Sequence, residues 1–184
     1  VELQLVQRPP SPDEAGWLRR NAAALSEVVE MRAMASPADG RDGRAMVELK
    51  AVDAAYPLLG TIEVEGTAGA AAVPAELPVL LKEEGGAWGA LAEPGLLARL
   101  GLRPGERVRV GEALFEIRGV LAREPDRVAS IVSFGPRLMV AAEALPATGL
   151  VQPGSLVRWK TRLLLPQGTT PGAFADAAAG RAAA

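Results

Sequence analysis

The chain has 184 residues, of which 49% are hydrophobic and 23% charged, and its formal net charge is −2. This composition is typical of a globular protein that is large enough for one domain or two small subdomains. There is no histidine and no cysteine, which excludes disulfides, thiolate nucleophiles, histidine-based triads and the usual ligand sets for zinc fingers, haem and iron–sulfur clusters. The basic residues form no block, so nucleic acid is not an expected partner.

The first fifty residues predict the order strand, helix, strand, strand. Apolar and polar residues alternate over 1–5, which is typical of a half-buried strand. Ser11 stands three positions before Glu14, the spacing of a capping box, and predicts that a helix follows. Alternating residues over 28–33 and a return strand over 44–52 predict a hairpin. This part of the chain therefore indicates an α+β fold.

After Asp53 the composition shifts toward turn residues and short elements, which indicates a subdomain boundary. Gly101 stands where a helix is expected to end in a left-handed cap, and Gly111-Glu112 has the two-residue spacing of a tight hairpin. The expected elements are strands around 62–64, 88–91, 107–110, 113–120 and 137–140, and a helix over 94–100.

The last part of the chain predicts one long strand and one helix. Alternation over 157–165 gives the longest expected strand, and the segment from Pro171 to Ala184 is expected to be helical. No stretch reaches the roughly 20 apolar residues of a membrane helix. The sequence begins directly in a strand-like run, without an initiator Met or a signal sequence, as expected of a piece of a longer protein.

Few residues offer catalytic chemistry. No Gly-Lys-Ser/Thr and no G-x-G-x-x-G motif is present, so no nucleotide or other cofactor is expected. Glu124 and Asp126 could supply an acid and a base. We interpret them as a solvated turn that also pairs with Arg123 and Arg127. Neither Lys50 nor Lys82 lies in a motif that would activate it; the sequence therefore predicts no catalytic, cofactor-binding or metal-binding residue.

Two segments have both a packing and a contact interpretation. Tyr56-Pro57 is expected to be a packed crossover turn, with a contact site as the alternative. The apolar stretch 128–140 is expected to bury Ile131, Leu138 and Val140, and its alternative is an exposed contact patch around Phe134. Tyr56, Phe134 and Arg137 are therefore the candidate contact residues.

Four segments resemble one protein family. They are Ala51-Val52-Asp53-Ala54-Ala55-Tyr56-Pro57-Leu58-Leu59-Gly60, then Leu100-Gly101-Leu102-Arg103-Pro104-Gly105-Glu106-Arg107-Val108, then Glu124-Pro125-Asp126, then Leu145-Pro146-Ala147-Thr148-Gly149-Leu150. In order and spacing they are similar to the extracytoplasmic, MacB-like domain of MacB/LolC/FtsX-type ABC transporter permeases, with the YbbP subgroup as the nearest match.

The resemblance implies an α+β fold in two subdomains. Residues 1–52 and 156–184 would form a split, porter-like part that is truncated at its C-terminus, and residues 53–155 an inserted, strand-rich, sabre-like part. It also implies a non-enzymatic domain on the periplasmic side of a bacterial inner membrane. There it would couple ATP hydrolysis to the movement of hydrophobic cargo or of a partner protein.

The implied partners are a cytoplasmic ABC ATPase subunit, a second permease copy or a related subunit, and a lipid, lipoprotein or periplasmic protein. Tyr56, Phe134 and Arg137 are the residues that could touch cargo or a partner. A free-standing module that binds a lipid or a peptide is the alternative function. A hydrolase that depends on Asp126 is a third.

Overall fold

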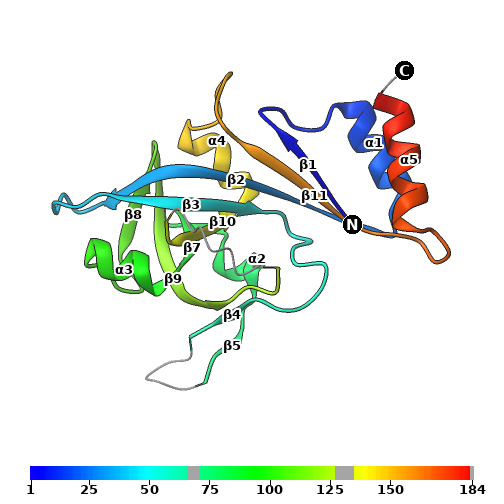
Figure 1. Ribbon diagram of the computed structural model, residues 1–184. Helices are drawn as coiled ribbons and strands as arrows, with labels where there is room; N and C mark the ends of the chain where they lie inside the picture. Colours follow the sequence, from blue (N-terminus) through cyan, green and yellow to red (C-terminus); the bar gives the residue numbers. More distant parts are fainter. Residues whose placement is uncertain (66–70, 127–134, 183–184) are drawn as a thin grey trace.

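Strands from both halves of the chain join in one large sheet (Figure 1). The computed structural model describes residues 1–65, 71–126 and 135–182. The longer strands are β1 (Glu2–Val6), β2 (Ala24–Pro37), β3 (Ala45–Val52), β7 (Ala87–Ala92), β8 (Arg107–Val110), β9 (Ala113–Arg123), β10 (Arg137–Ala141) and β11 (Arg158–Leu164). The short ones are β4 (Glu63–Val64), β5 (Val73–Pro74) and β6 (Glu83–Glu84).

The helices are few and mostly short. They are α1 (Pro12–Asn21), α2 (Leu77–Leu80), α3 (Pro94–Leu100), α4 (Leu145–Thr148) and α5 (Pro171–Ala182), with a 3₁₀ turn at Ala142–Ala144. The mixture of these helices with a large sheet confirms the predicted α+β class. Within the described ranges, no helix has both the length and the apolar character needed to span a bilayer.

Several predicted elements are confirmed, and the local chemistry explains them. The Ser11 side chain accepts a hydrogen bond from the backbone of Glu14, whose own side chain accepts one from the backbone of Ser11, so the capping box starts α1 as expected. Gly101 ends α3 in the left-handed conformation, at a φ of 62°. Strands β8 and β9 pair as the predicted tight hairpin around Gly111.

The central hairpin of β2 and β3 extends further than the sequence pattern indicates. Strand β2 has 14 residues and begins at Ala24, four positions before the expected start. Its first half pairs with β11 and its last three residues pair with β8, while β3 pairs along most of its length. The hydrogen bonds to neighbours on both sides keep the strand extended where apolar and polar residues do not alternate strictly.

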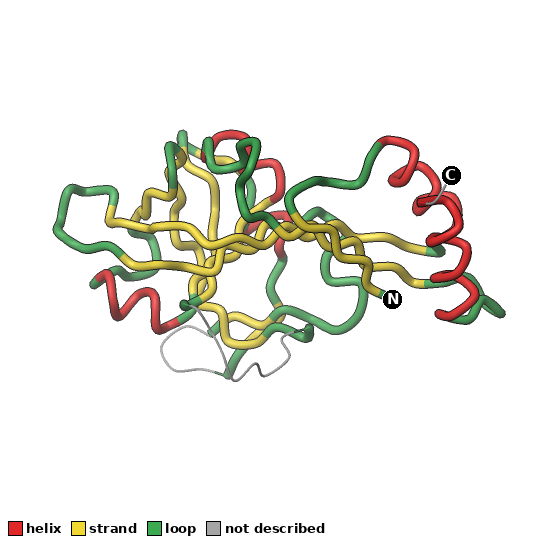
Figure 2. Tube along the Cα trace, turned by 45° about the horizontal axis from the view of Figure 1, so that its top comes forward, coloured by secondary structure: helices red, strands yellow, loops and turns green. Residues whose placement is uncertain are grey.

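The sheet has the strand order β1-β11-β2-β3-β10-β7-β9-β4-β5. Helices α1 and α5 lie together at one end of the molecule, and α3 with the β8–β9 hairpin lies at the other (Figures 1 and 2). Strand β3 is parallel to β10, so the hydrogen-bond ladder continues across the boundary predicted at residue 52. The division into residues 1–52 with 156–184 and residues 53–155 stays a prediction.

The two faces of the central strands differ in character. One face carries the main hydrophobic core, in which Val47 and Leu49 of β3 pack with residues of α3, β8, β9 and β10. A second apolar cluster around Ile62 and Met139 fills part of the opposite face. A small third cluster joins α1 and α5 to the sheet, with the rings of Trp17 and Phe174 centred 5.1 Å apart. The remaining part of the second face is occupied by charged residues.

Candidate functional site

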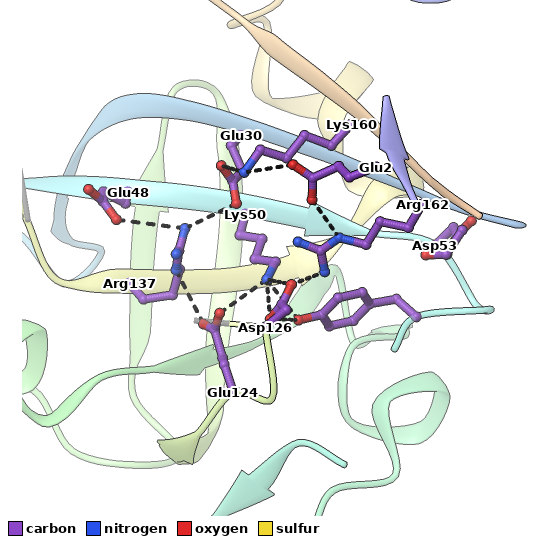
Figure 3. Close-up of polar contacts among 12 residues, drawn as sticks. Glu2, Glu30, Glu48, Lys50, Asp53, Glu124, Asp126, Arg137, Lys160 and Arg162 are labelled. Carbon is purple, nitrogen blue, oxygen red and sulfur yellow. Dashed lines mark hydrogen bonds and ion pairs between the residues drawn. The ribbon is translucent and has the colours of Figure 1, made fainter. Parts of the chain in front are cut away.

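The charged residues of the second face come from five neighbouring strands. Because side chains alternate between the two faces of a strand, every second residue of β1, β11, β2, β3 and β10 points the same way. Cross-strand neighbours in the register, such as Glu30 with Lys50 and Arg137 with Glu48, then lie beside each other. Figure 3 shows the resulting network, whose strand members are Glu2, Glu30, Glu48, Lys50, Arg137, Lys160 and Arg162.

Lys50 lies at the centre of the network, with 1% of its surface exposed. Its ammonium donates hydrogen bonds to the Tyr56 hydroxyl at 2.7 Å, to Glu124 Oε2 at 3.0 Å and to Asp126 Oδ2 at 2.9 Å. Burial lowers the pKa of Lys50 to about 8, against the opposing attraction of the Glu124 carboxylate. The fold therefore buries the Lys50 ammonium away from water. The carboxylates of Glu124 and Asp126 offset the lost hydration of this charge.

Tyr56 reaches the network from the turn that follows β3. Its hydroxyl donates to Asp126 Oδ1 at 2.6 Å, and the Lys50 ammonium lies 4.5 Å from the centre of its ring. Burial, and then the nearby Glu124 carboxylate, raise the pKa of Tyr56 above its usual range, so the hydroxyl stays a donor. Asp53 holds the start of this turn by accepting hydrogen bonds from Ser26 Oγ at 2.8 Å and from the backbone of Glu27 at 2.6 Å.

Arg137 connects β10 to three carboxylates. Its guanidinium lies 3.7 Å from Glu30, 3.7 Å from Glu48 and 3.2 Å from Glu124. The contact between Arg137 Nε and Glu124 Oε1 has the distance of an ion pair but not the geometry of a hydrogen bond. This contact is therefore chiefly electrostatic.

The outer part of the network lies on β11 and β1. Lys160 contacts Glu30 at 2.8 Å, and Arg162 contacts Glu2 at 3.0 Å and also pairs with Asp126. Burial on its own would raise the pKa of Glu30. Its hydrogen bond and ion pair with Lys160 outweigh that effect, so the pKa is lowered.

The geometry favours structural ion pairing over acid–base chemistry. The carboxylates of Glu2, Glu30, Glu48, Glu124 and Asp126 each contact at least one of the cations Lys50, Arg137, Lys160 and Arg162. Among the described residues, no group of three or more potential ligands is placed to hold a metal ion. A cavity of about 230 Å³ next to the network is lined by Glu93, Leu121, Ala122, Arg123 and Glu124, which is small for a ligand site.

The structure corrects the interpretation of Glu124 as part of a solvated turn. Glu124 is buried, with 7% of its surface exposed, and it pairs with Lys50 and Arg137. Arg123 pairs with Glu63 of β4 instead, and Arg127 lies outside the described residues. The turn residues around Glu124 suggested solvent, but the strand that precedes it delivers its side chain onto the charged face of the sheet.

The three candidate contact residues have different locations. Tyr56 and Arg137 are buried within this chain, with 4% and 8% of their surfaces exposed, and both are members of the network. Phe134 and Ile131 lie outside the described residues. Leu138 and Val140 are fully buried in the main core, as expected. The contact role of Tyr56, Phe134 and Arg137 stays a prediction.

Sequence reasoning missed the role of Lys50. A charged residue in the middle of a predicted strand, two positions after Glu48, is consistent with a polar strand face. The available signal was the run that follows, Ala51 and Val52, which is apolar on both faces and places Lys50 deep in the sheet. Its partners Glu124 and Asp126 are more than seventy positions away in the sequence, so the pairing depends on the tertiary fold.

The sequence and the fold have counterparts among known proteins. The chain is 31% identical over 144 residues to the uncharacterized ABC transporter permease YbbP of Escherichia coli (strain K12), a match that covers 78% of this chain and 16% of the relative. The chain thus spans about a sixth of that relative's length. No family model matches the sequence.

Three solved structures share the fold at low sequence identity. A domain of a permease protein from Porphyromonas gingivalis has a TM-score of 0.55 at 14% identity, and covers 95% of this chain and 70% of its own. The extracellular domain of the noncanonic ABC-type transporter YknZ from Gram-positive bacteria has a TM-score of 0.55 at 12% identity, with 89% and 83% covered. The periplasmic region of MacB from Actinobacillus actinomycetemcomitans has a TM-score of 0.54 at 10% identity, with 92% and 71% covered. Together with the sequence match, these structures confirm the family resemblance.

Proposed function

The chain belongs to the MacB-like extracytoplasmic domains of ABC transporter permeases, and we propose that it transmits movement mechanically. In this role it couples ATP hydrolysis by a separate cytoplasmic ATPase subunit to the displacement of hydrophobic cargo or of a partner protein outside the membrane. The domain itself is non-catalytic. It acts on the periplasmic side of the inner membrane, as part of a longer permease that works with a second copy or a related subunit.

The observation that carries this proposal is that ion pairs cross the predicted boundary in both directions. Lys50 and Arg162, from the 1–52 with 156–184 part, bind carboxylates of the 53–155 part. In return, Arg137 of the 53–155 part contacts Glu30 and Glu48 of the first part. Because these contacts are largely shielded from water, they are screened by salt much less than surface pairs. A load applied to one part is therefore passed to the other.

The central hairpin supports the same role. Strand β2 hydrogen-bonds to β11 near the end that carries α1 and α5, and to β8 near the opposite end (Figure 1). Extended strands held by ladders on both sides change length little. A displacement at the α1 and α5 end is thus carried along β2 without being absorbed by bending loops.

The charge pairing argues against the hydrolase alternative. A general base or nucleophile needs a carboxylate that reaches a substrate, but Glu124 is buried and Asp126 already accepts bonds from Lys50 and Tyr56. Both carboxylates are therefore already bound to partners within the chain. The network is therefore assigned a mechanical role.

The test measures distances inside and between domains in the full-length permease with its ATPase. The chain has no native cysteine, so, once any cysteine elsewhere in the permease is replaced, Leu156→Cys and Val79→Cys provide the labelling sites, at residues that are 76% and 55% exposed. Spin labels at both sites report the distance between the two predicted parts. A label at Val79 alone reports the distance between two permease copies. Addition of a non-hydrolysable ATP analogue should shift the distance between copies and leave the internal distance unchanged.

The Lys50→Met variant tests the role of the network, since it removes the central cation, and Lys82→Met, which removes a surface cation, is its matched control. In Lys50→Met the internal distance distribution should broaden and the shift between copies should shrink. If nucleotide leaves the distance between copies unchanged in the unmodified permease, mechanical transmission is contradicted. A lipid or peptide that binds the 184-residue chain saturably, without any nucleotide response, would instead support the binding-module alternative.

A further inference from the structure

Strand β1 forms one edge of the sheet, and among the described residues its only strand neighbour is β11 (Figure 1). The backbone nitrogen of Val1 donates to the carbonyl of Leu163 at 2.9 Å, the amide of Leu163 donates back to the Val1 carbonyl at 2.8 Å, and the amide of Gln7 donates to the Val157 carbonyl at 2.9 Å. In an antiparallel ladder, inward and outward pairs alternate. The odd-numbered residues of β1 therefore bond to β11.

Glu2, Gln4 and Val6 consequently direct their backbone N–H and C=O groups away from the sheet. Their side chains are exposed, and within the described part of the chain no hydrogen bond reaches these outward backbone groups. Edge strands are usually protected by proline, by charged side chains or by a bulge. Strand β1 has no proline between Glu2 and Val6, its only charged residue is Glu2, and its register with β11 is regular.

We propose that β1 pairs with the β1 of a second copy of this chain, antiparallel and with the twofold axis at Gln4. In this register Gln4 faces Gln4 of the second copy, and Glu2 faces Val6. All three outward residues then form hydrogen-bonded pairs, so the contact satisfies every outward backbone group of both strands. An interface of this kind is isologous, which means that the same patch serves on both copies.

The side chains favour this register over its neighbours. A twofold axis at Glu2 would place two carboxylates opposite each other, and like charges in directly opposed positions destabilise a strand pair. An axis at Val6 would leave the groups of Glu2 unpaired. With the axis at Gln4, Leu3 of each copy meets Leu5 of the other on the apolar face, where both leucines are half-buried in the single chain.

The contact is small. Two five-residue strands bury far less than the roughly 1,200 Å² of a stable protein–protein interface, so it needs copies that are already held together, as in a tethered pair. The inference rests on the second permease copy of the proposed function, but it concerns only where two copies touch and makes no use of nucleotide-driven movement. An extended strand from another protein is the competing occupant of this edge.

Disulfide trapping in membrane vesicles that contain the full-length permease tests the register. Under mild oxidation without nucleotide, Gln4→Cys should give a covalent dimer, because residues on the axis bring their Cα atoms within about 5.5 Å. Glu2→Cys is the matched control. In the proposed register its two copies are separated by about 13 Å along the strands, so it should give at least tenfold less dimer than Gln4→Cys.

Two further variants test whether Glu2 of one copy faces Val6 of the other, as the proposed register requires. The double variant Glu2→Cys with Val6→Cys should crosslink again, because these positions face each other across the axis. Adding Gln4→Pro to this double variant removes an outward N–H without touching the β11 ladder and should suppress its dimer, while circular dichroism of the 184-residue chain stays unchanged. The proposal is wrong if Gln4→Cys dimerises no faster than Glu2→Cys, or if Glu2→Cys dimerises best. Since no nucleotide is used, this outcome is independent of the mechanical proposal.

Discussion

The two faces of β3 are held in place by different forces. On one face Val47 and Leu49 are fully buried in the main hydrophobic core. On the other face Glu48 and Lys50 belong to the ion-pair network, and Lys50 is as inaccessible to water as Leu49. The same strand thus has one face that packs in the hydrophobic core and one face whose charged side chains are held by ion pairs.

The apolar face contributes chiefly to stability, whereas the charged face chiefly determines which segments pack on it. Apolar burial contributes about 25 cal/mol per Å² and tolerates small changes in geometry. A buried ion pair contributes less net stability than its close contacts suggest, because both ions lose their hydration. Its contribution is directional: the Lys50 ammonium donates to the Tyr56 hydroxyl and to the carboxylates of Glu124 and Asp126. These acceptors must meet at one point, which fixes where Tyr56 and the Glu124–Asp126 segment lie on the sheet.

Removing the central cation should have the largest effect. Lys50→Met keeps much of the side-chain volume but leaves Glu124 and Asp126 with a buried charge that Arg137 and Arg162 compensate only in part. Breaking a buried pair in this way costs about 3–5 kcal/mol. We expect a loss of that size in the free energy of unfolding of the 184-residue chain, measured by urea titration.

Lys82→Met is the control for this change, since Lys82 pairs with Glu84 at the surface with half of its side chain exposed. Its loss should stay below about 1 kcal/mol. If the two lysine variants lose the same free energy of unfolding, the buried network contributes no more to stability than a surface ion pair.

Truncation of a side chain on the apolar face should destabilise the chain by as much as Lys50→Met or by less. It should also lower hydrogen-exchange protection in a different part of the sheet. Leu49→Ala creates a cavity in the main core and should cost about 2–5 kcal/mol. Hydrogen exchange separates the two cases. Leu49→Ala should lower protection throughout the sheet, whereas Lys50→Met should lower it first around Tyr56 and Glu124. The same exchange pattern in both variants would contradict the division of roles between the faces.

The sequence predicted the elements better than it predicted the network. Local signals sufficed for α1, whose capping box is contained within Ser11–Glu14, and for the β8–β9 hairpin, whose turn residues are adjacent. The α+β class followed from the order of such elements. Strand β2 was predicted too short, because its extension depends on pairing with β8 and β11, which no local pattern encodes.

The candidate site shows more clearly what the sequence alone does not predict. Tyr56 and Arg137 were singled out as contact residues, and both belong to the network, but its centre at Lys50 was not recognised. Glu124 was assigned to solvent because Pro125 and the neighbouring charged residues are typical of an exposed turn. Whether a charged residue is buried depends on which residues fold against it, and here the partners are 74 and 76 positions apart.

The smallest predicted effect is a pH dependence of the melting temperature that arises from Lys50 on the charged face. The pKa of Lys50 in the folded chain is lowered to about 8, from 10.5 for an ordinary lysine. Between these values the unfolded chain binds more protons than the folded chain, so the free energy of unfolding rises with pH through this group. We therefore expect the melting temperature of the unmodified chain, relative to that of Lys50→Met, to increase between pH 8 and pH 10.

The pKa of an ordinary lysine, 10.5, sets the upper limit of this window. The charged groups around the ammonium are Glu124, Asp126, Arg137 and Arg162, and Lys50→Met retains all four. Tyr56 acts in the opposite direction, because its raised pKa makes the folded chain hold a proton that the unfolded chain releases above pH 10. Because Lys50→Met retains Tyr56, this contribution largely cancels in the comparison, which should level off above pH 10.5, where Lys50 of the unfolded chain has also lost its proton. A difference between the two chains that stays flat from pH 8 to pH 10 would mean that water reaches Lys50, and the charged face would then resemble an ordinary surface ion pair.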